Sequence, residues 1–332
     1  MSEVGVLGAG SWGTTLADLL ARRGHRVRLW AHEPEVVAAV NATHENPLFL
    51  PGCPLAPALE AREDPVATVQ GAELVVVVAP SHVLRGVVER ARGGVSPDAV
   101  VVSATKGIEA DSLYLMSDVI QAALPSHRVA AISGPSFALE VYQGQPTAVV
   151  AAAATLDTAQ RVQSAFATQR FRVYTSLDVI GVQLGGALKN IIAIAAGILD
   201  GLGLGHNPRA ALITRGLAEI ARLGQALGAD PLTFSGLAGM GDLILTSTGA
   251  LSRNRALGIA LAKGDRYEDY IATHRTVAEG ASTARAALAL AARHGVELPI
   301  CDQVACILFE GRPPRQAVAE LMDRTLKAEQ WR

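Results

Sequence analysis

The chain has 332 residues, of which 50% are hydrophobic and 18% are charged, and its formal net charge is −2. This composition excludes an intrinsically disordered chain, because disordered chains have too few apolar residues to build a core. A net charge near zero, without a basic run, also argues against nucleic-acid binding.

The cysteines and apolar runs set expectations for the cellular compartment. The three cysteines (Cys53, Cys301 and Cys306) are odd in number and lack metal-ligand spacing, which favours a reducing cytosol and no metal site. The longest apolar run, from Ile191 to Leu199, is too short to span a bilayer. We therefore expect a cytoplasmic protein without stable membrane insertion.

Short β-branched and apolar runs alternate with helical stretches up to residue 174. This alternation is typical of a doubly wound, Rossmann-type α/β domain. From residue 178 onward the chain is rich in alanine and leucine, without a convincing strand. The sequence therefore predicts a doubly wound domain at residues 1–177 and an all-α domain at residues 178–332. The predicted strands are Val4–Leu7, Val27–Trp30, Leu74–Val78, Val100–Ser103, Val129–Ile132, Thr147–Ala151 and Phe171–Tyr174.

The first predicted strand enters a glycine-rich turn that contains Gly8, Gly10 and Gly13. In a G-x-G-x-x-G turn, the first glycine permits the turn, the second admits a pyrophosphate, and the third allows close helix–strand packing. The amides of Ser11 and Trp12 begin the next helix, whose dipole favours an anion. The motif predicts a binding site for NAD or NADP. A glycine turn with a purely structural role is the alternative.

His32 and Glu33 follow the second predicted strand, about 20 residues past the glycines. An acid at this place would bind the ribose 2′-hydroxyl of NAD. His32, with help from Arg28, would instead face the 2′-phosphate of NADP. A solvated charged turn is the alternative role for Glu33, so the sequence leaves the choice between NAD and NADP open.

Lysine supplies only 4 of the 29 cationic side chains. Arginine stays protonated, whereas a desolvated lysine can release its proton. A lysine kept within a segment of small residues therefore indicates chemistry that arginine cannot supply. Lys106 and Lys189 are the two lysines in such segments.

Two loops that follow predicted strands carry candidate substrate contacts. Lys106 lies in the first loop, and Gly134 and Ser136 lie in the second. Because open α/β sheets bind ligands at the carboxyl ends of their strands, we expect both loops to face one crevice. There Lys106 would offer a charge, and the second loop would offer donors to a small polar substrate. A helix N-cap is the alternative role for Ser136.

Lys189 and Asn190 open the predicted helical domain, just after Gly185 and Gly186. On a helix, Lys189 shares a face with these glycines. Each glycine costs about 1 kcal/mol of helix stability, which indicates close approach by something. We predict that Lys189 is a general acid–base with room for a ligand beside it, and that Asn190 holds a hydroxyl or carbonyl. A lysine snorkelling out of a helix–helix contact is the alternative.

Two more polar segments follow in the helical domain. Asp242 comes after flexible glycines, with Thr246 one turn further on. Ser252 is a predicted N-cap, so free backbone amides follow it. Arg253 is unfavourable at a helix N-terminus unless an anion lies there, so we predict a phosphate site at Ser252, Arg253 and Asn254. A surface arginine paired with an acid is the alternative.

Together these segments resemble the bacterial NAD(P)-dependent glycerol-3-phosphate dehydrogenases. Gly-Ala-Gly-Ser-Trp-Gly, Ala-Thr-Lys-Gly, Ser-Gly-Pro-Ser-Phe-Ala, Gly-Ala-Leu-Lys-Asn, Gly-Asp-Leu and Ser-Arg-Asn-Arg occur in the family's order and spacing. The resemblance implies that Lys189 donates and accepts the proton, and it supports a homodimer. It implies substrate contacts at Lys106, Gly134, Ser136, Asp242, Ser252, Arg253 and Asn254. It implies cofactor contacts at Ser11, Trp12, His32, Lys106, Ala138, Arg253, Val277 and Glu279.

The resemblance implies reversible hydride transfer between NAD(P)H and C2 of dihydroxyacetone phosphate, giving sn-glycerol 3-phosphate for phospholipid synthesis. Lys189 would protonate the C2 oxygen, Lys106 and Asn190 would stabilise the developing charge, and Asp242 would hold the hydroxyl end. One alternative is a 3-hydroxyacid or 6-phosphogluconate dehydrogenase of similar build, which Arg253 at a helix start disfavours. The other is a non-catalytic dinucleotide sensor, which would not need these residues together.

Overall fold

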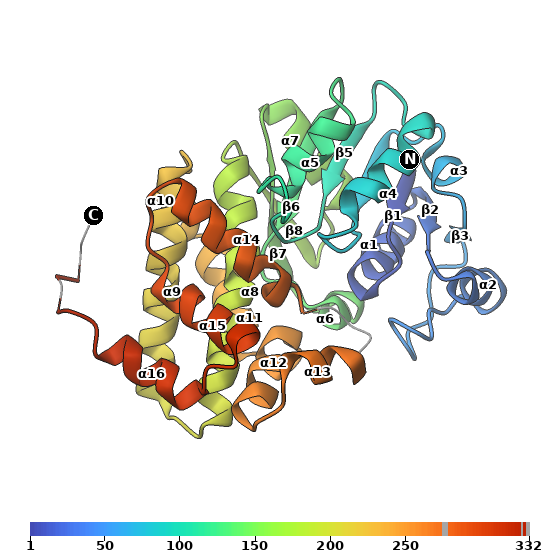
Figure 1. Cartoon of the computed structure of the whole chain (residues 1–332). Coiled ribbons are helices and arrows are strands. Elements are labelled where there is room, and N and C mark those ends of the chain that lie inside the picture. Colours follow the sequence, from blue (N-terminus) through green and yellow to red (C-terminus); the bar gives the residue numbers. More distant parts are fainter. Residues whose placement is uncertain (274–277, 327, 330–332) are drawn as a thin grey trace. The chain divides into compact units, whose positions relative to one another are not determined.

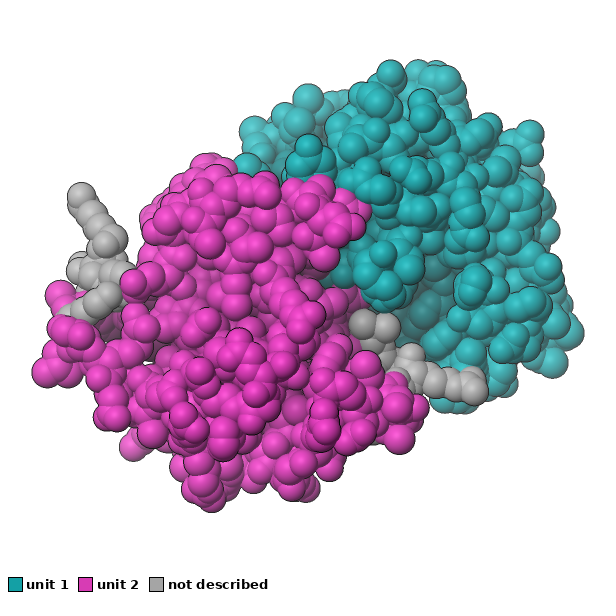
Figure 2. Space-filling view, in the orientation of Figure 1, with its two compact units in different colours: residues 1–106, 114–182 teal, residues 107–113, 183–332 magenta. Residues whose placement is uncertain are grey.

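The computed structural model describes residues 1–273, 278–326 and 328–329 and divides into two compact units (Figure 2). The first unit comprises residues 1–106 and 114–182, and the second comprises residues 107–113 and 183–332. The segment 107–113 follows a strand of the first unit yet belongs to the second. A single boundary after residue 177 places segment 107–113 in the first domain, whereas the structure places it in the second unit.

A single eight-stranded sheet organises the first unit (Figure 1). Its strands are β1 (Glu3–Leu7), β2 (Arg26–Trp30), β3 (Glu60–Arg62), β4 (Leu74–Val77), β5 (Val100–Ser103), β6 (Arg128–Ser133), β7 (Thr147–Ala153) and β8 (Phe171–Ser176). Their spatial order is β3-β2-β1-β4-β5-β6-β7-β8. All neighbours are parallel except β6 and β7. The order reverses between β1 and β4, which is where open α/β sheets bind ligands.

The predicted doubly wound fold is confirmed, with two differences in the sheet. All seven predicted strands form, each within three residues of its expected ends. The short edge strand β3 was missed, because Glu-Ala-Arg carries no apolar or β-branched pattern; its pairing with Arg28–Trp30 makes it a strand. The antiparallel direction of β7 was also not foreseen.

Helices cover both faces of this sheet (Figure 1). They are α1 (Ser11–Arg22), α2 (Pro34–Thr43), α3 (Pro65–Val69), α4 (Leu84–Ala91), α5 (Met116–Ala123), α6 (Ala138–Tyr142) and α7 (Leu156–Phe166), with the 3₁₀ turn η1 (Arg92–Gly94). Along β4, Leu74 and Val76 pack in a core with α1, α2 and α7, whereas Val75 and Val77 pack in a core with α3, α4 and α5. Burial on both faces explains why this strand is apolar throughout.

The described part of the second unit contains helices and loops, which confirms the prediction of an all-α domain. The helices are α8 (Val179–Gly201), α9 (His206–Ala226), α10 (Pro231–Phe234), the π-helical turn η2 (Leu237–Gly241), α11 (Asp242–Thr248), α12 (Arg253–Ala262), α13 (Tyr267–Thr273), α14 (Glu279–Arg293), α15 (Pro299–Glu310) and α16 (Pro314–Met322). The division between the units falls within the first turns of α8.

Helix α8 is long and apolar enough to cross a membrane, but 89% of its most apolar window is buried inside the structure. That burial is typical of a core helix. A side chain on Gly197 would overlap the backbone of Arg255 in α12, and one on Gly258 would overlap the backbone of α8 at Ile194. Helices α8 and α12 therefore pack backbone against backbone, which only residues without a Cβ allow.

A buried carboxylate joins α9 to α15. Glu219 is 2% exposed, and its two carboxylate oxygens accept hydrogen bonds from the amides of Ile300 (2.8 Å) and Cys301 (3.3 Å). These amides belong to the first turn of α15, where no intrahelical acceptor exists. Burial raises the pKa of Glu219 to about 7, although the two amide hydrogen bonds oppose this rise.

Candidate active site

Each glycine of the turn after β1 has its own steric reason to be glycine. Gly8 has φ +120°, and a Cβ there would lie 2.9 Å from the backbone of Val78. A Cβ on Gly13 would overlap the carbonyl oxygen of Gly8, whereas a Cβ on Gly10 would meet no protein atom within 4 Å. The first and third glycines thus allow close packing. The space beside Gly10 is where a pyrophosphate would approach the backbone.

Helix α1 starts directly after Gly10, which is its N-cap residue. The first amides of a helix lack intrahelical acceptors, and their dipoles favour an anion. The hydroxyl of Ser11 donates to the carbonyl of Phe49 at 2.6 Å, so the amide of Ser11 is the group that suits an anion. Trp12 is half-buried beside it.

The end of β2 presents side chains of both charge types. His32 is exposed, with its ring centroid 6.3 Å from that of Trp30. Glu33 is the N-cap residue of α2, but its carboxylate makes no capping hydrogen bond. Arg28 donates to the carbonyls of Ala67 (3.2 Å) and Gln70 (2.6 Å), which ties its guanidinium to the α3 segment instead of a 2′-phosphate.

Lys106 and Ser136 converge on one carbonyl at the carboxyl ends of β5 and β6. The Nζ atom of Lys106 donates to the Gly134 oxygen at 3.1 Å, and the Ser136 hydroxyl donates to it at 3.0 Å. Gly134 has φ +148°, and a Cβ there would lie 2.9 Å from the backbone of Val149. The two predicted loops do meet in the first unit. The N-cap alternative for Ser136 is wrong, because Phe137 precedes α6 and the hydroxyl bonds elsewhere.

Ala138 is the first residue of α6, and its carbonyl accepts the hydroxyl of Thr15 at 3.3 Å. This bond ties the start of α6 to α1 one turn beyond the glycine motif. The cofactor contacts at Val277 and Glu279 rest on the resemblance alone. Val277 lies outside the described residues, and Glu279 is the first residue of α14.

The second unit buries a lysine against a carboxylate. The Nζ atom of Lys189 lies 2.8 Å from Oδ1 of Asp242 and donates to the hydroxyl of Thr246 at 2.5 Å. That hydroxyl in turn donates to Asp242 at 3.2 Å. The side chains of Lys189 and Asp242 are 8% and 1% exposed. The snorkelling alternative is therefore wrong, because the amine is held inside the unit.

Asn190 belongs to a second buried polar chain. Its Oδ1 accepts from Nδ2 of Asn254 at 3.0 Å, and the amide of Gly280 donates to Oδ1 of Asn254 at 2.9 Å. A Cβ on Gly280 would lie 2.5 Å from the carbonyl oxygen of Asn190. Asn254, predicted as a phosphate contact, thus fixes α8, α12 and α14 to one another and orients Asn190.

Ser252 caps α12, as the sequence indicates, because its hydroxyl accepts from the amide of Arg255 at 3.2 Å. Arg253 follows at the first helical position and keeps exposed surface. Desolvation lowers the pKa of the Arg253 guanidinium from its usual value, and the Glu279 carboxylate partly offsets this. Among the described residues no acid forms a salt bridge with Arg253. A bound anion would supply a partner in direct contact with the guanidinium.

Gly185, which precedes Lys189 by one helical turn, has a simpler explanation than a ligand. A Cβ on Gly185 would lie 2.5 Å from the carbonyl oxygen of Ala238 in η2. The close approach that the sequence indicated at this position comes from protein backbone. The prediction of ligand space beside the lysine is wrong at this glycine.

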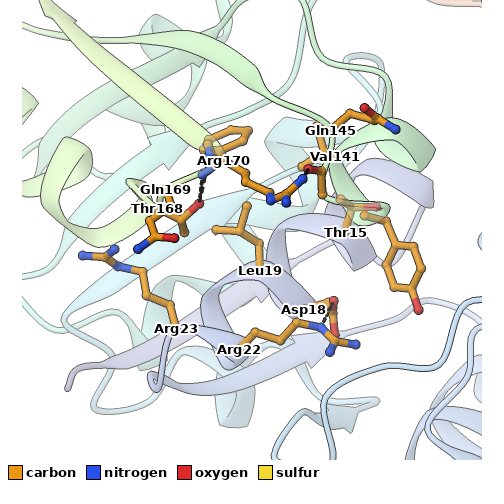
Figure 3. A pocket seen from close by; sticks show the side chains of 13 residues that line it. Thr15, Asp18, Leu19, Arg22, Arg23, Val141, Gln145, Thr168, Gln169 and Arg170 are labelled. Carbon is orange, nitrogen blue, oxygen red and sulfur yellow. Dashed lines mark hydrogen bonds and ion pairs between the residues drawn. The ribbon is translucent and has the colours of Figure 1, made fainter.

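Figure 3 shows a cavity of about 380 Å³ in the first unit, between the body of α1 and the segment before β8. Arg22, Arg23 and Arg170 line it, and each donates to the carbonyl of a different segment. These carbonyls belong to Pro54 (2.8 Å), Ser164 (2.6 Å) and Gly144 (3.1 Å), respectively. The three guanidinium groups therefore do not converge on one anion, and none of the predicted cofactor contacts lines the cavity.

The described residues also contain no group of three His, Cys, Asp or Glu side chains placed to hold a metal.

Comparison with known proteins agrees with this arrangement. Family models match residues 3–159, as the NAD-dependent glycerol-3-phosphate dehydrogenase N-terminus, and residues 178–319, as the corresponding C-terminus. A relative from Geobacter sulfurreducens named glycerol-3-phosphate dehydrogenase, NAD(P)+, is 56% identical over 335 residues and covers 100% of both chains. Its namesake from Geobacter metallireducens is 55% identical over 330 residues, covering 98% of each.

A crystal structure of glycerol-3-phosphate dehydrogenase from Coxiella burnetii superposes with a TM-score of 0.94 at 41% identity. The superposition covers 97% of this chain and 99% of that one. Both halves of the chain, the order of its motifs and its fold therefore agree. The chain belongs to the NAD-dependent glycerol-3-phosphate dehydrogenase family and is an NAD(P)-dependent oxidoreductase.

Proposed function

We propose that this chain catalyses the reversible reduction of dihydroxyacetone phosphate to sn-glycerol 3-phosphate with NAD(P)H. The observation that carries the proposal is the buried amine of Lys189, held by Asp242 and Thr246 in a chain that also carries a dinucleotide-type turn. A buried charged pair costs desolvation energy. The place of the lysine among small apolar residues of α8 favours a chemical role over a purely structural one.

Lys189 donates a proton to the C2 oxygen of the ketone during reduction and accepts it in the reverse direction. Asp242 and Thr246 fix the position of the amine. Lys106 and Asn190 stabilise the negative charge that develops on the C2 oxygen. Gly134 and Ser136 contact the polar groups of the substrate. The dinucleotide supplies or takes up the hydride.

The phosphate of the substrate binds at the start of α12. Ser252 is the N-cap there and its hydroxyl takes the amide of Arg255. The amides of Arg253 and Asn254 lack intrahelical acceptors and suit an anion. Arg253 offers two parallel N–H groups to phosphate oxygens. Phosphate binding away from C2 then orients the reacting carbon.

The dinucleotide binds along the first turn of α1. The proposed contacts are Gly8, Gly10, Ser11, Trp12, Gly13, His32, Lys106, Ala138, Arg253, Val277 and Glu279. NAD and NADP both fit, because His32 would face the 2′-phosphate of NADP and the neighbouring Glu33 would bind the ribose 2′-hydroxyl of NAD.

We further propose a cytoplasmic homodimer that supplies glycerol 3-phosphate for phospholipid synthesis. Exposed large apolar side chains at Leu232, Met240, Ile244 and Leu251 support an interface on the second unit. Analytical ultracentrifugation at micromolar concentration tests the homodimer, and a monomer would reject it.

The decisive assay follows oxidation of NADH and of NADPH at 340 nm with dihydroxyacetone phosphate. Pyruvate and a 3-keto acid serve as competing substrates. Turnover restricted to dihydroxyacetone phosphate supports the proposal. Preference for a keto acid would favour a hydroxyacid dehydrogenase. Dinucleotide binding without any turnover would favour a non-catalytic sensor.

A further inference from the structure

The loop after α2, residues 44–56, is fastened along one face of α1. The helix residues involved are three or four positions apart, the spacing that places side chains on one face. They and their loop partners are Ser11 with the Phe49 carbonyl (2.6 Å), Thr14 with the Asn46 side chain (2.9 Å), Asp18 with the Ala56 amide (2.7 Å) and Arg22 with the Pro54 carbonyl (2.8 Å). The loop is thus tied to the whole length of the helix that begins at the glycine turn.

Asn46 is the centre of this attachment. Its side chain is fully buried, and Nδ2 donates to the carbonyl of Ala9 at 2.8 Å and to the hydroxyl of Thr14 at 2.9 Å. Its Oδ1 accepts from the amide of Phe49 at 3.1 Å. Both N–H donors of the amide are used, and so is its oxygen. Aspartate or alanine cannot reproduce this set of bonds, and an unmet buried group is costly.

The carbonyl of Ala9 lies between the first two glycines of the turn. Besides Asn46 it accepts the hydroxyl of Thr14 at 3.0 Å, so two donors hold it toward the protein interior. In a planar trans peptide, the C=O of one residue and the N–H of the next point in opposite directions. A carbonyl of Ala9 held inward therefore turns the amide of Gly10 outward, toward the open space beside that glycine.

We propose that Asn46 is a positioning residue for dinucleotide binding: it fixes the Ala9–Gly10 peptide so that the Gly10 amide faces the pyrophosphate. This inference rests on the proposed dinucleotide role of the turn. Asn46 does not touch the dinucleotide. It preorganises the turn, so that the free energy of binding is not reduced by the cost of ordering that peptide.

The test compares the full chain with Asn46→Ala and with the matched control Asn41→Ala. Asn41 also makes two side-chain bonds, to the amide and carbonyl of Ala61, but these lie on β3 and not on the turn. NADH fluorescence titration should show a roughly tenfold higher Kd for Asn46→Ala, the effect of losing about one good hydrogen bond. The Kd of Asn41→Ala should stay within about twofold of the parent. In steady state, KM for the dinucleotide should rise for Asn46→Ala while kcat and KM for the ketone stay unchanged.

A second variant keeps the proposal testable if Asn46→Ala folds poorly. In Asn46→Asp an ionised carboxylate would repel the Ala9 carbonyl, whereas a protonated one can donate a single hydrogen bond to it. Burial raises the pKa of such a carboxyl. The ratio of its Kd to that of the parent should therefore fall as the pH is lowered from about 8 to about 6.

Three outcomes would overturn the proposal. They are an unchanged Kd in Asn46→Ala, an equal rise in both alanine variants, and a pH-independent ratio for Asn46→Asp. A parent chain that binds neither NADH nor NADPH would instead reject the proposed function itself.

Discussion

The pair formed by Lys189 and Asp242 allows a test that separates chemistry from stability. The two groups lie 2.8 Å apart and are almost fully buried. Removing one partner of such a pair leaves an uncompensated buried charge, which costs about 3–5 kcal/mol. We therefore expect Lys189→Met and Asp242→Asn each to lower the free energy of unfolding by about that amount. A loss of activity in Lys189→Met alone would be ambiguous, because part of the protein would be unfolded.

The double variant Lys189→Met/Asp242→Asn removes both charges together. Replacing a buried ion pair with neutral groups of similar size is often close to neutral for stability. We expect the double variant to recover most of the stability that each single variant loses, a coupling that a double-mutant cycle measures directly. If Lys189 is the proton donor, turnover should stay about 10²–10⁴ below the parent in the double variant.

Urea unfolding of the four proteins gives the stability cycle, and NADH oxidation with dihydroxyacetone phosphate gives turnover. NADH fluorescence checks that dinucleotide affinity is retained. Recovery of turnover together with stability in the double variant would refute an acid–base role for Lys189, because methionine cannot transfer a proton. Additive stability losses would refute the energetic coupling of the pair.

Three further changes have clear expected results. Gly13→Ala should lower the melting temperature and abolish dinucleotide binding, because its Cβ would overlap backbone, whereas Gly10→Ala should melt like the parent and lose only affinity. Arg253→Ala should lose about 1.5–3 kcal/mol of substrate binding, seen in kcat/KM for the phosphorylated ketone; equal effects on an unphosphorylated ketone would reject the phosphate site. The pKa of Glu219 is about 7 in the folded protein, against 4.5 for an ordinary glutamate. Because the folded protein holds this proton more tightly than the unfolded chain, the contribution of Glu219 to stability is fully present below pH 4.5 and is lost as the pH rises through about 7. Glu219→Gln lacks this titration, and urea unfolding should show its stability relative to the parent improving by up to about 3 kcal/mol between pH 4.5 and 7.5.

Most strands of the sheet could be predicted because each has a recognisable pattern in its own residues. Strands buried on both faces read as continuous apolar runs, and Leu74–Val77 and Val100–Ser103 are of this kind. The edge strand Glu60–Arg62 has no such signal, since only its hydrogen bonds to β2 define it. The direction of β7 depends on its pairing with β6, which no local pattern encodes.

In the candidate site, too, the contacts between residues distant in sequence could not be predicted. Gly8, Gly13 and Ser252 could be interpreted from sequence because each has a local role: Gly8 has the positive φ of a turn, Gly13 packs against the Gly8 carbonyl oxygen, and Ser252 caps the helix that follows it. The partners of Lys189 and Asn46 are distant in sequence: Thr246 lies 57 residues from the lysine, and Ala9 lies 37 residues from the asparagine.

Asp242 illustrates the consequence of such distant pairing. Sequence and resemblance assign it to the substrate hydroxyl, whereas the fold places it against the amine of Lys189. A carboxylate in that position fixes the place of the Lys189 amine inside the second unit. The residue types of a site can therefore be predicted from motifs, but which group contacts the lysine depends on the packing of α8 against α11.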